Sequence, residues 1–308
     1  SGDDSETKQS SDVKAGLNAC MKALAAFCLS SEGVSHVVGS GGLAFVVGHL
    51  REDMAIRMGE SNEIGMEGGE DGSSSASKAI AAAVVLLRNV AENGGGGGGD
   101  ITQRLLSAGV LGLVGDSLSM LQAQSSSSAE DVAAMADLQI LLATLIAAGG
   151  DGAGSRGNAE VAASIISSGI LQQVDSLMSS QSSAFVASPQ CVLATNALLN
   201  SLNASGQSDC LHTARNNNAI TAATTTISGG SGSGVGAVLV AVPSSSSSSS
   251  PSPSSSLAGI DAQALMMRMM NANSNDITIA RACAQTVGVL YSTGPEATTA
   301  AATATATA

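Results

Sequence analysis

One motif recurs along the chain and constrains the fold more than any other feature. It consists of an apolar stretch, two small residues, a glycine and a second apolar stretch. Three copies are clear: "VSHVVGSGGLAFVV" at 34–47, "ITQRLLSAGVLGLV" at 101–114 and "VAASIISSGILQQV" at 161–174. They align on Gly42, Gly109 and Gly169, and a weaker copy, "LAGIDAQALM" at 257–266, places Gly259 at the same point. Such internal repetition is typical of a stack of similar helical units.

Each copy predicts two helices that meet at a sharp corner. Glycine accepts the positive φ or the close backbone approach that such a corner requires. The apolar positions that follow the glycine recur at helical spacing, as Val110 and Val114 do in the second copy. We therefore expect helices at 101–106 and 110–121 that meet at an angle around Gly109.

Longer helical patterns flank the copies of the motif. They are rich in Ala and Leu, which are strong helix formers, and they cover 13–29, 76–93, 129–148 and 189–205. The acids Glu130 and Asp131 and the imino acid Pro189 suit the first turn of a helix. The predicted order is a short helix, a glycine corner, a medium helix, a loop and a long helix, and this order repeats.

This order resembles that of the armadillo repeat proteins. The segment "AVVLLRNVAEN" at 83–93 is similar to the third helix of an armadillo repeat, and "ITQRLLSAGVLGLVGDSL" at 101–118 is similar to the next two helices. The resemblance covers 13–205 and implies an all-α, armadillo-type right-handed α-solenoid. The aligned glycines are 67 and 60 residues apart, more than the roughly 40–47 residues of such a repeat. Polar inserts account for the excess, at 61–76, 94–99, 125–128 and 148–157.

The chain divides into five predicted segments. They are a disordered acidic tail at 1–12, armadillo-like repeats at 13–227, a Ser/Gly/Pro-rich disordered insert at 228–256, C-terminal capping helices at 257–294 and a disordered tail at 295–308. Disorder is expected where serine, glycine or alternating Ala and Thr leave too little apolar surface to offset the entropy of ordering.

Charge and composition narrow the range of partners. The net charge of −13 is expected to repel nucleic acid and anionic lipid, so a charged partner is expected to be basic. The acidic, methionine-containing run at 51–71 could dock such a partner or could be a solvated loop. Arg88 and Asp137 interrupt the longest apolar runs, so no membrane span is expected. The acidic start and the five cysteines without CxxC spacing favour an intracellular site, cytoplasmic or nuclear.

No familiar catalytic or metal-binding pattern is present in the sequence. The glycine run "NGGGGGGD" at 93–100 lacks the Lys and the Ser/Thr of a phosphate-binding loop. The three histidines, His36, His49 and His212, have no Cys or carboxylate at ligand spacing. The chain also lacks GxSxG and SxxK. We therefore expect a non-enzymatic protein without a cofactor or a metal.

Two asparagines are the best candidates for a binding site. Aligning "LLRNVAEN" with "ALLNSLNA" puts Asn89 and Asn200 at one position of the long helices, where Phe27 and Thr144 stand in the other two copies. The resemblance implies that such asparagines line a concave groove and hydrogen-bond the backbone of an extended peptide. We expect the partner to contact Arg88, Asn89 and Asn200. Exposed asparagines without a ligand are the alternative interpretation.

The predicted function follows from this architecture. We expect an interaction scaffold that binds a protein or peptide segment along the concave face of the repeats. The alternative is a regulatory subunit or cochaperone-like protein that grips a folded partner domain through its convex or end surface. The sequence does not indicate the oligomeric state.

Overall fold

The computed structural model describes residues 16, 18–63, 71–94, 98–123, 128–150, 156–179, 184–211 and 260–292. All regular secondary structure within these ranges is helical, which confirms the all-α class. The predicted tails at 1–12 and 295–308 and the predicted insert at 228–256 lie outside the described residues, as does Gly259.

The helices follow one another in short succession along the chain. Residues 18–27 form the first described helix. The others are α2 (Ser31–Gly39), α3 (Gly42–Glu63), α4 (Asp71–Asn93), α5 (Gly98–Ser107), α6 (Val110–Ala123), α7 (Ala129–Ala148), α8 (Arg156–Ser167), α9 (Ile170–Ser179), α10 (Ala184–Ala187), α11 (Pro189–Ala204), the 3-10 helix η1 (Ser208–Leu211), α13 (Ala262–Ala272) and α14 (Ile277–Ser292).

Two helix starts follow directly from the sequence, and one insert differs from its prediction. Ser128 and Asp131 form a capping box at the start of α7, and Pro189 occupies the first turn of α11. The insert expected at 61–76 is shorter, because α3 continues to Glu63 and α4 already begins at Asp71. Part of the acidic run at 51–71 is therefore helical rather than a loop.

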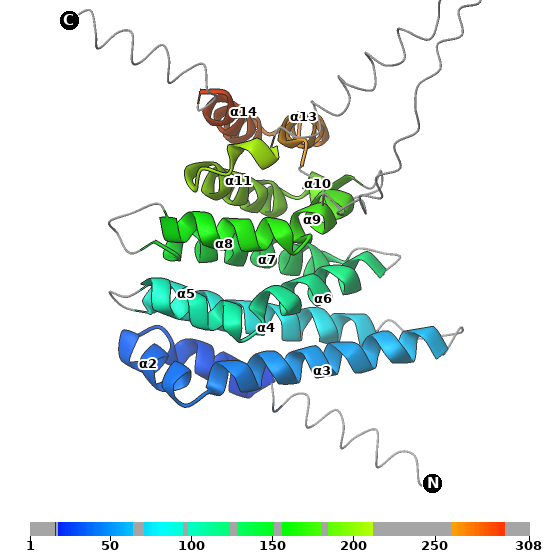
Figure 1. The fold of residues 1–308 in the computed structure, drawn as a ribbon. Helices are drawn as coiled ribbons and strands as arrows, with labels where there is room; N and C mark the ends of the chain where they lie inside the picture. Colours follow the sequence, from blue (N-terminus) through cyan, green and yellow to red (C-terminus); the bar gives the residue numbers. More distant parts are fainter. Residues whose placement is uncertain are drawn as a thin grey trace, which may run out of the picture.

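The helices are arranged in layers that stack along one direction (Figure 1). The long helices α4, α7, α11 and α14 pack on one another in that order and form one row. The medium helices α3, α6 and α9 form a second row in the same order, and α13 packs on α9. In the last layer α13 and α14 therefore take the places of the medium and the long helix. Both lie within the segment at 257–294 that the sequence assigns to capping helices.

Glycines with a positive φ form the corners between the short and the medium helices. The φ values are 88° at Gly109 and 77° at Gly169, as the motif predicts. The bend is 55° between α5 and α6 and 70° between α2 and α3. In the first copy the corner residue is Gly41, with φ 76°, and Gly42 is already the first residue of α3. The first copy therefore aligns one residue earlier than the apolar pattern indicates.

The core runs through all layers and consists mainly of aliphatic side chains. Its largest fully buried members include Leu86, Leu87, Leu105, Leu118, Leu141, Leu142 and Ile146. Buried alanines such as Ala83, Ala134 and Ala194 let neighbouring long helices approach closely. Each buried Leu stabilises the fold by about 1.5–3 kcal/mol relative to an exposed one. The stacking of the long helices therefore follows from their Ala/Leu-rich composition.

Polar pairs join neighbouring helices in the row of medium helices. They are Arg51 with Asp116 (Nε–Oδ2, 2.8 Å), Gln122 with Ser176 (Nε2–Oγ, 3.3 Å) and Arg268 with Asp175 (Nη2–Oδ1, 3.1 Å). A Cβ atom at Gly112 would lie 3.0 Å from Cζ of Arg51, so the glycine leaves room for the guanidinium. These pairs fix the register of the layers more than they add stability, because their side chains are partly exposed.

The central helix differs from the expectation of no membrane span. By length and composition α7 is long and apolar enough to cross a membrane. Two bent helix pairs would also qualify if each acted as one span: the first is α2 with the first part of α3, and the second is α5 with α6. In the structure α7 packs between α4 and α11, and 61% of its most apolar 18-residue window is buried.

Candidate functional site

The row of long helices leaves one side of each helix uncovered, and we call this side the long-helix face. On α11 it consists of exposed residues spaced four, three and four apart: Leu193, Ala197, Asn200 and Ala204. The less buried residues of α4 have the same spacing: Ala81, Val85, Arg88 and Glu92. In α7 the equivalent positions are half-buried: Ala133, Asp137, Ile140 and Thr144. In this register Asn200 corresponds to Arg88, one residue before Asn89.

Asn89 is buried in the wall of this face rather than exposed on it. Its side chain is 7% exposed, and Nδ2 donates a hydrogen bond to the backbone carbonyl of Ala25 at 2.8 Å. This carbonyl lies near the end of the 18–27 helix, where Leu29 N binds the carbonyl of Ala26 instead. Asn89 therefore supplies a donor to a carbonyl that the helix leaves open, and it holds the first helix on α4.

Arg88 lies on the long-helix face beside two acids. Its Nε is 3.5 Å from Oε1 of Glu92, one turn further along α4. Burial raises the pKa of Asp137 on α7, and the positive charge of Arg88 partly opposes this rise. The electrostatic contact between Arg88 and Asp137 therefore reaches from α4 to α7 across the face.

Asn200 is exposed and makes its contact in the opposite direction along the stack. Its Nδ2 donates to Oγ1 of Thr286 on α14, at a distance of 3.4 Å. Asn89 thus contacts the helix before its own layer, whereas Asn200 contacts the helix after it. The two amides are not repeated members of one ladder.

Two grooves open on the long-helix face, each with a volume of about 580 Å³. The first lies between the 18–27 helix and α4, and Arg88 and Asn89 line it together with Lys22 and Leu29. The second lies between α11 and α14 and contains Asn200. The structure therefore brings Arg88 and Asn89 together and places Asn200 in a separate groove.

The second groove contains polar residues that the sequence did not single out. They are Asn196, Gln285 and Thr286. Asn196 precedes Asn200 by one turn of α11, and this spacing is the one sequence signal that could have identified it. Gln285 and Thr286 belong to α14, whose contribution depends on its packing against α11.

Metal-binding groups and cysteine thiols were the other candidates for a site among the described residues. Among them no group of three or more His, Cys, Asp and Glu side chains could hold a metal ion. Burial raises the pKa of the Cys28 and Cys283 thiols, and it raises that of Cys191 to about 12. These three thiols therefore remain protonated at neutral pH, in which form they are poor nucleophiles.

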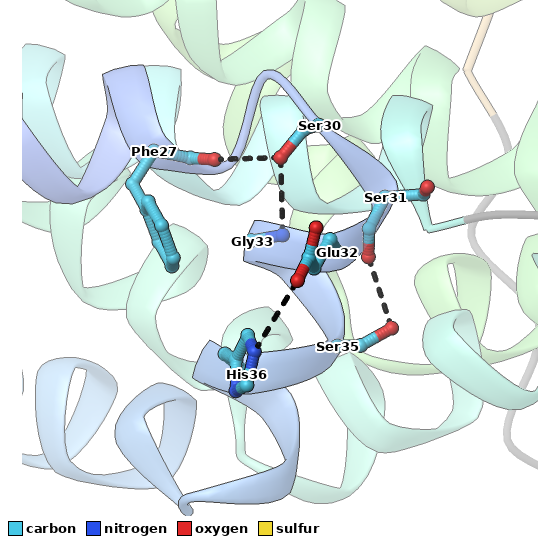
Figure 2. A network of polar contacts seen from close by, with 7 residues as sticks. All are labelled: Phe27, Ser30, Ser31, Glu32, Gly33, Ser35 and His36. Atoms are coloured by element: carbon cyan, nitrogen blue, oxygen red, sulfur yellow. Dashed lines mark hydrogen bonds and ion pairs between the residues drawn. The ribbon is translucent and has the colours of Figure 1, made fainter.

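The first layer also carries two exposed aromatic pairs, Phe27 with His36 and Phe45 with His49, which we call together the first-layer patch. Phe27 packs its ring against His36, with centroids 6.5 Å apart, and Phe45 stacks on His49 at 6.1 Å. Figure 2 shows the corner behind the first pair, where the hydroxyl of Ser30 accepts a hydrogen bond from the backbone N–H of Gly33 and donates one to the carbonyl of Phe27.

Neither a family model, nor a curated protein, nor a solved structure matches the chain.

Proposed function

We propose that the chain is an armadillo-type, right-handed α-solenoid that binds a segment of a partner protein along the long-helix face. Three glycine corners and the continuous row of long helices support this arrangement. In such a stack each layer buries its neighbour, and the uncovered side of the row becomes an elongated binding surface. The proposed role is that of a non-enzymatic scaffold, with a protein or peptide as the partner.

One observation carries this proposal: both grooves open on the same row of helices. The first groove involves α4 and the second α11, and α7 lies between these two helices. A partner segment that contacts both must therefore run along the row rather than around one layer. The net charge of −13 favours a basic partner.

The predicted site residues have different roles in this proposal. Arg88 and Asn200 lie on the face and contact the partner directly. Asn89 acts indirectly, because its amide holds the 18–27 helix that forms one wall of the first groove. The roles predict that an Asn89 variant lowers stability as well as binding, whereas variants of the other two lower binding more than they lower stability.

The proposal is tested with a partner that crosslinking and mass spectrometry identify in a native lysate. The purified partner is titrated against the wild type, an Arg88→Ala, Asn200→Ala double variant and a Gln122→Ala control in the row of medium helices. Losing the partner's contacts with the half-buried Arg88 and the exposed Asn200 is expected to weaken binding about tenfold or more. The control is expected to bind as the wild type does. Equal affinity of the double variant and the wild type contradicts the proposal.

The first-layer patch favours a second candidate function, which is to grip a folded domain as a regulatory subunit or cochaperone-like protein. Phe27 is 50% exposed and Phe45 is 72% exposed, and exposed apolar groups of this size often mark interaction surfaces. This function predicts that a Phe45→Ser variant loses the partner while the Arg88→Ala, Asn200→Ala variant keeps it.

A further inference from the structure

The uncovered side of α7 carries a single charged residue. It consists of Ala133, Asp137, Ile140 and Thr144, and of these four only Asp137 is charged. Because α7 packs between α4 and α11, it separates the two grooves of the long-helix face. Arg88 lines the first groove and acts electrostatically on Asp137. A partner segment that leaves the first groove toward the second therefore passes this carboxylate.

The charge of Asp137 is incompletely balanced by its surroundings. The side chain is half-buried, and it forms no hydrogen bond or ion pair with another described residue. Arg88 supplies the opposing charge, but its Nε lies 3.5 Å from Oε1 of Glu92. One guanidinium therefore serves two carboxylates, and the three side chains together keep one negative charge in excess.

A segment laid across α7 would remove more water from this carboxylate. Burial already raises the pKa of Asp137, and the charge of Arg88 opposes that rise only in part. A charge that loses its water without gaining a partner destabilises the complex. A neutral or acidic residue at the crossing would leave the carboxylate in that state, whereas a basic residue would pair with it.

We infer that Asp137 selects a partner segment that carries a lysine or an arginine where the segment crosses α7, and that the carboxylate pairs with this side chain. The inference rests on the proposed function and adds to it a residue that determines specificity. Ile140 lies one turn after Asp137 on the same side of α7 and offers an apolar surface to the aliphatic stem of such a side chain.

The acidic run at 51–71 is the competing location for a basic contact, and Glu52 represents it in the test. Glu52 is exposed on α3, which belongs to the row of medium helices. Asp137→Asn and Glu52→Gln each remove one negative charge from the chain, but only the first removes it from the long-helix face. A comparison of the two variants separates a local ion pair from attraction by the net charge.

The test selects binders of the full chain from a random dodecapeptide library displayed on phage. Peptides selected by the wild type and by Glu52→Gln are expected to carry Lys or Arg at one position about threefold or more above its frequency in the unselected library. This enrichment is expected to be absent from the peptides that Asp137→Asn selects. No basic enrichment, enrichment that persists with Asp137→Asn, or enrichment that Glu52→Gln also loses overturns the inference.

A measurement of folding excludes a merely structural role of Asp137. Urea unfolding of Asp137→Asn is expected to have a midpoint equal to or above that of the wild type, because the substitution removes a charge that burial disfavours. A lower midpoint would identify Asp137 as a structural partner of Arg88 and would overturn the inference.

The outcome is separable from that of the proposed function when the selected peptides are titrated against the Arg88→Ala, Asn200→Ala variant. If they lose affinity for this variant but contain no base that depends on Asp137, the scaffold stands and only the role of Asp137 is wrong. If such a base is found but the double variant binds as the wild type does, Asp137 pairs with a base and the proposed binding along the face is wrong.

Discussion

Replacing Gly109 by alanine is expected to lower the free energy of unfolding by about 1 kcal/mol. Its φ of 88° lies in the left-handed region, where an L-residue costs roughly 1–2 kcal/mol. The new Cβ atom would meet nothing closer than Nη1 of Arg51 at 3.8 Å, so no steric term adds to this cost. Reduced freedom of the unfolded chain offsets roughly 0.4–1 kcal/mol of it.

The matched control is Gly115→Ala, six residues further along α6. Gly115 lies inside the helix, and a Cβ atom there would lie 3.9 Å from Oε1 of Gln173, an ordinary contact. Alanine is favoured over glycine in a helix interior by about 0.8–1.0 kcal/mol, so this variant is expected to be more stable than the wild type. The two variants should therefore differ by about 2 kcal/mol.

Urea unfolding followed by far-UV circular dichroism measures this difference. If Gly109 forms a corner, Gly109→Ala unfolds at a lower urea concentration than the wild type and Gly115→Ala unfolds at a higher one. The dependence of the free energy of unfolding on urea concentration is expected to be similar in all three proteins. If both variants gain stability, position 109 continues a helix and the account of the corner is wrong.

Three further predictions use the same unfolding assay. Gly33→Ala is expected to lower the free energy of unfolding by more than Gly109→Ala does, because its Cβ atom would overlap the carbonyl oxygen of Phe27. A smaller loss would show that the turn before α2 is loosely packed. Gln139→Met is expected to raise stability by about 1–3 kcal/mol, because this fully buried amide has no hydrogen-bond partner among the described residues, and a loss of stability contradicts that assignment. The pKa of Cys191 in the folded chain, about 12, exceeds the ordinary 9.0. The contribution of the protonated thiol to stability is therefore complete below pH 9.0 and declines as the pH rises toward 12. A Cys191→Ala variant is expected to lose less stability over this pH range.

The corners were predictable from the local sequence, whereas the rotation of the long helices about their axes was not. Gly109 and Gly169 stand out because an apolar helical pattern stops and restarts around each of them. Gly41 and Gly42 are consecutive, and the apolar pattern can be aligned on either of them. Only the observed φ distinguishes the two.

The direction of Asn89 depends on how α4 is rotated about its axis. Packing against the 18–27 helix on one side and α7 on the other sets this rotation, and neither contact is visible in the sequence around position 89. Thr286 is a similar case, since it gains a role only where α14 meets Asn200 of α11, 86 residues earlier in the chain. The helices were therefore predictable to a large extent, but the composition of the grooves was not.

The position of the bound partner tests the central claim most directly. A photoreactive residue is placed at Ala197, in the middle of the exposed side of α11, and in a second variant at Gln122 in the row of medium helices. Each variant is irradiated with the purified partner, and the crosslinked products are mapped by mass spectrometry. The account predicts abundant crosslinks from position 197 and few from position 122. Crosslinks from position 122 alone would contradict it.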